Sequence, residues 1–293
     1  MKKKSSLKHT GAFWAFCAPC CILFGVFFLV PLVLSIAFSF TNYDGWKTID
    51  FVGLTNYITL FKDSKFYLSL GRTLLYTVCT LPFRVIIPLL VAVLLCSKRV
   101  AAKSLTRTMV YIPVLMSALV VGITINWMFS QEYGLVNFII RSLGGTALEW
   151  SLNPRLATFV IAFASVWASI GFNMILYIGG INSISNDLYE AATIDGASGV
   201  QAFFRITVPM LAPTTFMVVL LSTVNLLKEY ALVQGITQGG PGLSTTFIIQ
   251  YIFDKGFNQM QYGYASAIST VVMIIFAPVS YTHLRAHETR SNL

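Results

Sequence analysis

The stretch EAATIDGASGVQAFFRITVP occupies residues 190–209 and lies between two long apolar runs. Its density of polar and charged groups is stable only outside the hydrocarbon of a membrane. Gly196, near its middle, adopts a left-handed backbone conformation at little cost, whereas most other residues do not. Pro209 ends the stretch and cannot continue a regular helix. The pattern therefore predicts two short helices that are separated by a tight turn and project from the membrane.

The composition of the whole chain requires lipid as a solvent. Hydrophobic residues make up 56% of the 293 residues, charged residues make up 11%, and the mean hydropathy is +0.73. A soluble domain carries about 25% charged residues. A water-soluble core cannot hide this much apolar surface, so much of the chain is expected to lie in a bilayer.

Six apolar runs are candidates for membrane-spanning helices, which need about 20 mostly apolar residues. They cover approximately residues 12–40, 73–96, 109–129, 156–181, 214–234 and 262–279. Prolines in or beside several of them predict kinks, which neighbouring helices tolerate in a membrane. We therefore expect an all-α multi-pass membrane protein with six transmembrane helices.

The basic residues predict the orientation of these helices. Lys2, Lys3, Lys4 and Lys8 precede the first run, and the short loop 97–108 carries four more basic residues. Short loops rich in Lys and Arg remain in the cytoplasm. The N-terminus is thus expected to be cytoplasmic, and alternation of the spans places residues 182–213 there too. Because the net charge of +9 is concentrated at membrane ends and no recognition motif is visible, we expect no nucleic-acid partner.

The sequence offers no chemistry for an enzyme. The three histidines lie near the two ends of the chain, and the CxxC at residues 17–20 is part of an apolar run. No metal site, cofactor or catalytic triad is expected from them. A GxxxxGK[ST] motif is also absent from the sequence, so ATP is not bound by a P-loop and energy for transport must come from a partner.

Several motifs resemble those of permease subunits of binding-protein-dependent ABC sugar importers. Residues 190–209 resemble the EAA loop of these permeases, and FVGLTNY at 51–57 resembles the signature after their first span. YIPVLMSALVVGITINWMF at 111–129 and ITQGGPGLSTTFIIQYIF at 236–253 follow the same family pattern. The resemblance covers about residues 12–278 and points to the carbohydrate-uptake branch, with the MetI-like transmembrane domain of type I importers.

This resemblance implies a permease of the bacterial cytoplasmic (inner) membrane that imports a sugar, an oligosaccharide or a sugar-like solute such as a glycerol phosphate. The implied partners are a second related permease, a dimer of ATP-binding cassette ATPases and an extracytoplasmic solute-binding protein. The ATPase would grip the EAA loop at the following residues: Glu190, Ala191, Ala192, Asp195, Gly196, Ala197 and Pro209. An amphipathic helix that merely lies on the membrane surface is the alternative for this segment.

The same resemblance implies sugar-contacting positions on the fourth and fifth spans. These positions are Ser165, Ser169, Phe172, Asn225 and Glu229. The first three share one helical face by their spacing, and so do the last two. Arg84, in the second span, has three alternative roles: it lines the solute pathway, pairs with Glu229, or snorkels to an interface. Glu229 and Lys228 are alternatively a pair of interface anchors.

Two other classes of protein fit the sequence less well. A secondary transporter would show inverted repeats and buried acidic or histidine relays, but no repeat is visible and Glu229 is the one deep acidic residue. A membrane enzyme would need a nucleophile beside a base, or a metal cluster, within the spans. Neither pattern is present.

The chain is expected to fall into three regions. Residues 1–72 hold the cytoplasmic tail, the first transmembrane helix and an outer loop. Residues 73–278 form the transmembrane domain, with the EAA loop at about 182–213. Hydrophobicity stops abruptly before SYTHLRAHETRSNL at 280–293, and this ending resembles sequencing-adapter read-through. Residues 279–293 are therefore expected to be a non-native tail, with a natural cytoplasmic tail as the alternative.

Overall fold

The computed structural model describes residues 4–46, 49–97 and 102–291, and the side chains of residues 13–46, 49–97 and 102–278. Within these ranges the chain is helical, apart from loops and one isolated antiparallel bridge between Thr41 and Phe51. Lys2, Lys3, Lys98 and Arg99, which entered the prediction of orientation, lie outside the described residues. The chain forms two compact units: residues 1–64 with 252–276, and residues 65–251 with 277–293.

Unit 1 is built from the first apolar run and the start of the last one. Its elements are α1 (Lys4–Phe24), η1 (Gly25–Leu29), α2 (Val30–Phe38), α3 (Thr55–Lys62), η4 (Asp254–Asn258) and the first part of α15 (Tyr262–Ser291). Residues Phe13–Phe38 are long and apolar enough to cross a membrane, and none of their most apolar window is buried within the chain. Such a helix is stable only where lipid or another protein surrounds it.

Hydrogen bonds join the chain just after α2 to α3 and to the start of α15. The Asn56 side-chain amide donates to the carbonyl oxygens of Ser39 and Thr41 at 2.9 and 2.8 Å. The Gly263 amide donates to the carbonyl of Tyr43 at 3.0 Å, where a larger residue would collide with the backbone of Thr41. The end of the first span and the start of the last one therefore lie together, as an even number of intervening crossings requires.

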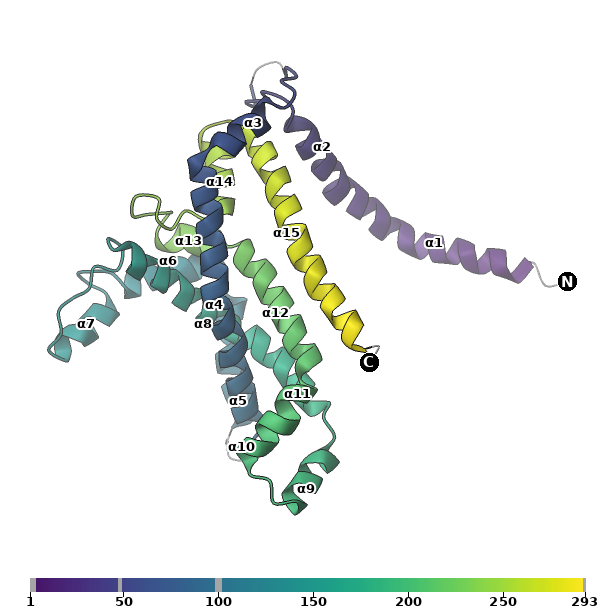
Figure 1. Ribbon diagram of the computed structural model, residues 1–293, viewed down its shortest axis with the longest axis vertical. Helices are drawn as coiled ribbons and strands as arrows, with labels where there is room; N and C mark the ends of the chain where they lie inside the picture. Colours follow the sequence, from purple (N-terminus) through teal and green to yellow (C-terminus); the bar gives the residue numbers. More distant parts are fainter. Residues whose placement is uncertain (1–3, 47–48, 98–101, 292–293) are drawn as a thin grey trace. The chain divides into compact units, whose positions relative to one another are not determined.

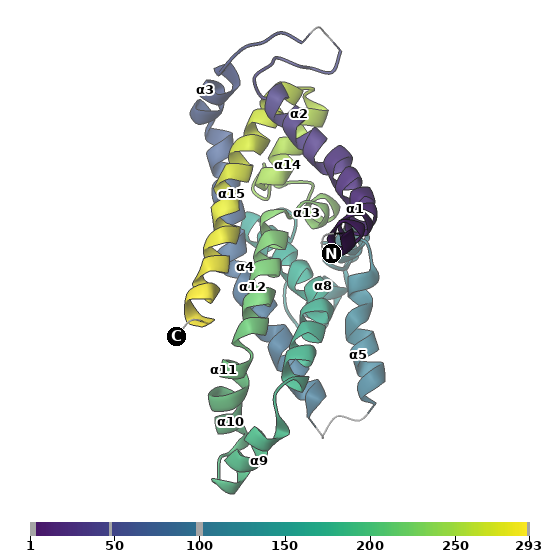
Figure 2. The same ribbon diagram turned by 90° about the vertical axis from the view of Figure 1, so that its right-hand side faces the viewer.

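Unit 2 contains the remaining helices (Figure 1). They are α4 (Ser64–Cys96), α5 (Lys103–Tyr111), η2 (Ile112–Leu115), α6 (Ala118–Met128), α7 (Leu135–Ser142), α8 (Pro154–Asn182), α9 (Asn186–Ile194), α10 (Gly199–Ala202), η3 (Phe203–Thr207), α11 (Val208–Met210), α12 (Ala212–Leu227), α13 (Ala231–Ile236) and α14 (Ile248–Phe253). Figure 2 shows the three long helices α4, α8 and α12 of this unit. Two apolar clusters hold the unit together, and each of these helices contributes to both.

The membership of the two clusters gives the direction of each helix. In α4 the chain runs from Tyr76 in the first cluster to Leu95 in the second, and α8 runs the same way. α12 runs in the opposite direction, from Val218 in the second cluster to Leu226 in the first. Since α5, η2 and α6 lead back from the second cluster to the first, successive segments alternate in direction as the six-span prediction requires.

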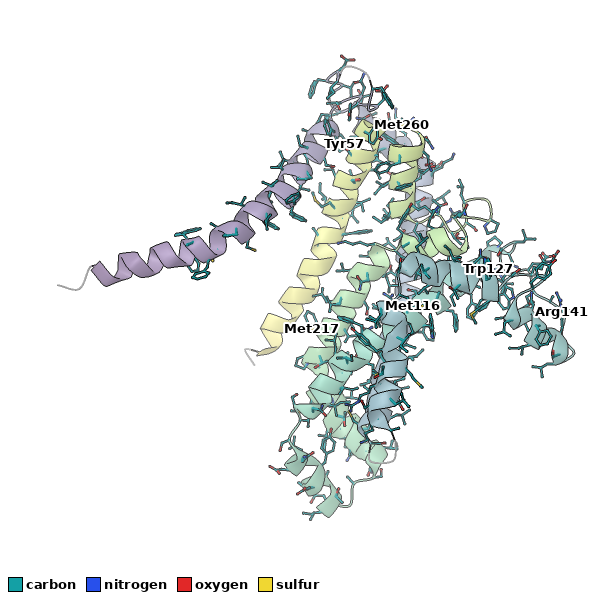
Figure 3. All side chains as sticks on the ribbon, turned by 180° about the vertical axis from the view of Figure 1, so that it is seen from behind. Tyr57, Met116, Trp127, Arg141, Met217 and Met260 are labelled. Atoms are coloured by element: carbon teal, nitrogen blue, oxygen red, sulfur yellow. The ribbon has the colours of Figure 1, made fainter. Side chains whose placement is uncertain are left out.

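The third and fifth predicted spans are not the continuous helices that the apolar runs suggested. Between Lys103–Leu115 and Ala118–Met128 the chain bends by 100°, around Met116 (Figure 3). Met116 is extended, with φ −83° and ψ 145°, and a proline at 113 starts the short 3₁₀ segment before it. The fifth span ends at Leu227 rather than at residue 234. The bend in the third span agrees with the kinks that the prolines predict, whereas the fifth span is shorter than its apolar run.

Three helices are long and apolar enough to cross a membrane, and five segments are if each bent pair counts as one span. The shorter apolar helix Tyr262–Pro278 is the sixth candidate, so the described residues are consistent with six crossings. The backbone of α15 continues as a helix to Ser291, and the origin of residues 279–293 stays a prediction.

Small residues allow the close packing on which the bends depend. Gly122 in α6 faces Gly235 in α13, and a methyl group added to Gly122 would lie 2.9 Å from the Gly235 Cα. Helices in membranes commonly pack through such small residues, because they let two backbones approach. This contact seats the short helix α13 beside α6 after α12 has ended.

Candidate functional site

A group of buried polar side chains begins at Tyr76, in the first apolar cluster of unit 2, and continues toward the second cluster. We call it the polar cluster and define it as Tyr76, Thr80 and Arg84 on α4 with Ser165 and Asn173 on α8. Each of these residues is at most 6% exposed. Polar groups this deep in a membrane protein are costly and often functional.

Arg84 is held by the backbone of α8. Its Nε and Nη2 atoms donate to the carbonyl oxygen of Ser165 at 3.2 and 3.0 Å. Its charge also interacts with that of Glu229, beyond the end of α12. The guanidinium is therefore directed into the helix bundle, and snorkelling to an interface is wrong for this residue.

Asn173 ties three long helices together beside this arginine. Its Nδ2 donates to the carbonyl of Arg84 on α4 at 2.9 Å and to the Ser222 hydroxyl on α12 at 3.2 Å. An amide nitrogen carries two hydrogens, so these bonds satisfy both. Asn173 accordingly fixes the positions of α4, α8 and α12 around the polar cluster.

Three buried hydroxyls of the polar cluster lack hydrogen bonds within the described parts of the chain. They are Tyr76 Oη, Thr80 Oγ1 and Ser165 Oγ. Tyr76 and Ser165 lie near each other, but their hydroxyls do not form a bond of standard geometry. Leaving a buried hydroxyl without a partner costs about 1–3 kcal/mol. Such groups are retained where a ligand or water supplies the missing bonds.

Sequence reasoning missed Tyr76 and Thr80, although a signal was available. With Arg84 they are spaced at i, i+4 and i+8, which places all three along one side of α4. Arg84 alone attracted attention because it is charged. A stripe of polar residues along an otherwise apolar helix indicates a candidate site as much as a single charged residue does.

The predicted positions on α8 fall at different depths. Ser165 is fully buried in the polar cluster, whereas Ser169 is half-buried and its hydroxyl donates to the Val166 carbonyl at 2.9 Å. Phe172 is 41% exposed. The predicted face therefore begins inside the bundle at Ser165 and emerges at its surface at Phe172.

The expectation of one helical face for Asn225 and Glu229 was wrong. α12 ends at Leu227, so Asn225 is an exposed residue of the last turn and Glu229 lies beyond the helix. The carboxylate of Glu229 is half-buried and is oriented by the backbone amides of Tyr230 and Leu232. Leaving the helix gives this charge polar partners that a continuous apolar helix would not supply.

The EAA loop, residues 182–213, shows the break that its glycine predicts. Gly196 has φ +75° and directly follows Asp195, the C-cap of α9. The amide of Ala197 donates to the Ala192 carbonyl at 2.8 Å, and that of Gly196 donates to the Thr193 carbonyl at 3.1 Å. This pair of bonds is a Schellman motif, in which glycine avoids the steric penalty of a left-handed residue.

Further hydrogen bonds make the EAA loop a defined shape at one end of unit 2 (Figure 1). Ser198 and Gln201 form a capping box at the start of α10. The hydroxyls of Tyr189 on α9 and Thr207 on η3 lie 2.9 Å apart and share a hydrogen bond. Two short helices are thus held side by side, and a rigid protrusion rather than a loose linker results.

Most of the predicted coupling residues lie on the surface of this protrusion. Glu190, Ala191, Asp195, Gly196 and Pro209 are exposed, while Ala192 and Ala197 are half-buried. This surface does not consist of small side chains alone. Large apolar side chains add to it: Ile194 is 86% exposed, Val200 68% and Phe204 64%. A monomer in water rarely leaves such a set uncovered.

Comparison with known proteins supplies the family. Residues 51–289 match the family described as "Binding-protein-dependent transport system inner membrane component". The chain belongs to this permease family. A permease of this family is a transport subunit, not an enzyme.

Several relatives align along nearly the whole permease. The arabinooligosaccharides transport system permease protein AraP of Bacillus subtilis is 33% identical over 93% of this chain and 87% of its own length. The lactose transport system permease protein LacF of Rhizobium radiobacter is 31% identical over 94% of both chains.

A solved structure confirms the fold of the permease. One chain of a bacterial ABC transporter involved in the import of alginate superposes with a TM-score of 0.81, over 96% of this chain and 98% of that one, at 24% identity. A second structure of an alginate transporter, in complex with a pentasaccharide-bound periplasmic protein, gives a TM-score of 0.82 at 22% identity over 97% and 96%. The ABC importer transmembrane fold expected from the sequence is therefore present.

Proposed function

We propose that this permease imports a neutral sugar or oligosaccharide across the cytoplasmic membrane, with its N-terminus in the cytoplasm. The observation that carries the proposal is the set of buried hydroxyls without partners in the polar cluster. A sugar presents hydroxyls that both donate and accept, so it can satisfy Tyr76, Thr80 and Ser165 together. The sugar permeases AraP and LacF, aligned over nearly their full lengths, support this solute class.

The charges around the polar cluster favour a neutral solute over a phosphate. Arg84 is positive, but its guanidinium is engaged with the Ser165 carbonyl and lies within the electrostatic influence of Glu229. A site for a phosphate would be expected to offer uncompensated positive charge. A sugar needs hydrogen-bonding partners and apolar faces instead, and Phe172 on α8 adds an aromatic ring where the face reaches the surface.

The EAA loop is proposed to connect this pathway to an ATPase. Its two short helices are rigid and expose apolar side chains, so a groove on a partner protein can hold them. α8 leads into the loop and α12 leaves it, which allows motion of the loop to reach Ser165 and Glu229. The full assembly we propose contains a second related permease, a dimer of ATP-binding cassette ATPases and an extracytoplasmic solute-binding protein.

A single hydroxyl tests the solute site. Tyr76→Phe removes an unpartnered Oη without changing the ring, so stability should rise slightly or stay the same. Uptake of the transported sugar should show a KM raised about fivefold or more, from the loss of ~1 kcal/mol of solute hydrogen bonding. The matched control is Tyr177→Phe, because Tyr177 Oη is also buried without a bond of standard geometry but belongs to the other apolar cluster. Equal effects of the two variants on KM would refute the proposed site.

Thiol labelling tests the orientation. In a cysteine-free background, Ser104→Cys lies on the exposed side of α5 and Trp46→Cys lies in the loop after α2, where the native side chain is 85% exposed. A membrane-impermeant maleimide should label the cysteine at 46 in intact cells and the one at 104 after the cells are opened. The reverse pattern would contradict a cytoplasmic N-terminus.

A further inference from the structure

Unit 1 contains a polar cavity that shares no residue with the polar cluster. We call it the loop pocket; it has a volume of about 440 Å³ and is lined by Asn42, Asp44, Asn56, Asp63, Lys255 and Tyr264, among others. Sites for small molecules commonly measure about 300–1,000 Å³. Residues between 42 and 63 and residues between 255 and 264 both contribute to its walls, so it exists only in the folded chain.

Two residues of α3 and its C-cap line this cavity. Asn56 and Thr59 are spaced at i, i+3 on one face of α3, which ends at Lys62, and Asp63 follows as the C-cap. The Asn56 amide nitrogen is already engaged with backbone carbonyls, which fixes the side chain in place. A rigid polar wall of this kind can select a ligand by the positions of its hydroxyls.

The opposite wall is formed by the turn before α15. The Tyr264 hydroxyl donates to Asp63 Oδ2 at 2.8 Å and so joins the two walls. Lys255 Nζ lies 5.7 Å from the centre of the Tyr264 ring. Met260, with φ +56°, shapes the turn between them and lies at the same end of unit 1 as Tyr57 (Figure 3).

The chemistry of the lining indicates which ligand fits. Two carboxylates disfavour the binding of an anion, and the charge of Lys255 disfavours the binding of a bare metal cation. The polar walls disfavour the binding of an apolar molecule. Amide, carboxylate and hydroxyl groups beside the aromatic rings of Tyr43 and Tyr264 suit a neutral polyhydroxylated molecule. A carboxylate oxygen accepts more than one hydrogen bond, so Asp63 can serve Tyr264 and a ligand hydroxyl together.

We infer that the loop pocket binds roughly one or two rings of a neutral saccharide, as a site separate from the polar cluster. The inference rests on the proposed function for the orientation of the chain and for the class of the transported solute. In the proposed orientation the pocket lies on the outer side of the membrane, where a solute is present before it crosses. A longer oligosaccharide would gain affinity from this site through its additional rings.

Photoaffinity labelling of the full-length permease in lipid nanodiscs tests the inference. The probes are neutral di- and trisaccharides of arabinose, glucose and xylose, each with a diazirine at the reducing end, and a galacturonate trimer serves as the charged comparison. Neutral probes should label peptides within residues 42–63 or 255–264, and the matching unlabelled sugar should compete. Failure of every neutral probe to label these peptides, or preferential labelling by the galacturonate trimer, would overturn the inference.

Two tryptophan variants on α3 provide the matched comparison. Thr59→Trp fills the cavity and should reduce labelling at least tenfold, whereas Ile58→Trp carries the same ring on the opposite, exposed face and should not. Tyr264→Phe, a milder change, removes the bond between the walls and should weaken labelling several-fold. If Thr59→Trp and Tyr264→Phe both label like the unmodified protein, the pocket is not a saccharide site.

Uptake by cells that contain the complete transporter separates this inference from the proposed function. Uptake of the labelled sugars without labelling of the loop pocket would overturn the inference and leave the proposed function standing. Labelling of the pocket in a transporter that imports none of these sugars would support the inference and count against the proposed solute. Cross-linking of a cysteine at position 59 to a binding protein at equal yield with and without sugar would assign the pocket to a protein partner and overturn the inference.

Discussion

Apolar side chains are usually buried and polar side chains are usually exposed, and the EAA loop and the polar cluster are opposite exceptions to this rule. The EAA loop exposes apolar side chains where the prediction places water, with Ile194 86% exposed. The polar cluster buries hydroxyls and a guanidinium where the prediction places lipid, with Arg84 6% exposed. Each arrangement is unfavourable for the isolated chain. We propose that a different partner relieves each arrangement, a protein in the first case and a hydroxylated solute in the second.

The two regions also differ in what holds them. The EAA loop keeps its shape through bonds between residues close in sequence, such as the capping box of Ser198 and Gln201. The polar cluster depends on bonds between distant residues, of which Arg84 to Ser165 spans 81 positions. Changes in the loop should therefore alter binding to a partner and leave the fold intact. Changes in the polar cluster should alter both stability and transport.

Arg84→Gln should produce the largest effect of the changes considered. It removes charge-assisted hydrogen bonds to the Ser165 carbonyl and the favourable interaction of the Arg84 charge with Glu229. We expect a loss of about 3 kcal/mol in the free energy of unfolding, measured by unfolding in mixed micelles. Adding Glu229→Gln should recover part of the loss. If the losses of stability from the two single substitutions simply add in the double variant, the charges of Arg84 and Glu229 do not stabilise each other. Electrostatics would then not contribute to the difference between the two regions.

Ile194→Asp should act on partner binding alone. A charge at this exposed position cannot pack in an apolar groove, so affinity for the ATPase should fall about tenfold or more, equivalent to ~1.4 kcal/mol. Unfolding should not change. Binding is measured by titrating the purified ATPase onto the permease in nanodiscs. Leu143→Asp, at a residue that is 83% exposed after α7, is the control and should bind normally; equal losses would mean that the EAA loop has no special role.

Asn173→Leu should have a moderate effect on stability. Hydrogen bonds between membrane helices contribute about 0.6 kcal/mol each on average, so losing two should destabilise the permease by ~1 kcal/mol. A double-mutant cycle with Ser222→Ala, followed by unfolding in mixed micelles, isolates the bond between these side chains. A coupling energy near zero would show that Asn173 acts through Arg84 alone.

Ser198→Ala should have the smallest effect. Loss of this N-cap costs about 1 kcal/mol or less, and the consequence should stay within α10. The backbone amide of Gln201 normally donates a hydrogen bond to the Ser198 hydroxyl at 3.3 Å, so hydrogen exchange at this amide should accelerate. Amides in α8 and α12 should exchange as before. Faster exchange throughout α8 would show that the EAA loop is not the locally stabilised body described above.

The sequence was sufficient to predict those features of the fold that depend on a single continuous segment. Long apolar runs set the presence of α1, α4, α8 and α15, because burying apolar side chains in lipid does not depend on which neighbour is present. Gly196 set the turn of the EAA loop, because the penalty for a left-handed residue is a local steric effect. The proline at 113 hinted at a break, but its 100° bend also depends on how α6 packs on α13 through Gly122 and Gly235.

The tertiary structure alone decided the contents of both candidate sites. Nothing in the spacing of residues shows that Ser165 meets Arg84 or that Asn173 reaches Ser222, because these contacts depend on the rotation and depth of separate helices. The spacing of Asn225 and Glu229 likewise does not show that α12 ends at Leu227 and leaves Glu229 off the helical face. Asp63 and Tyr264 are 201 positions apart and meet only when the first and last spans come together. Local propensity and hydropathy therefore determined the helices, while packing between distant segments determined which polar groups share a cavity.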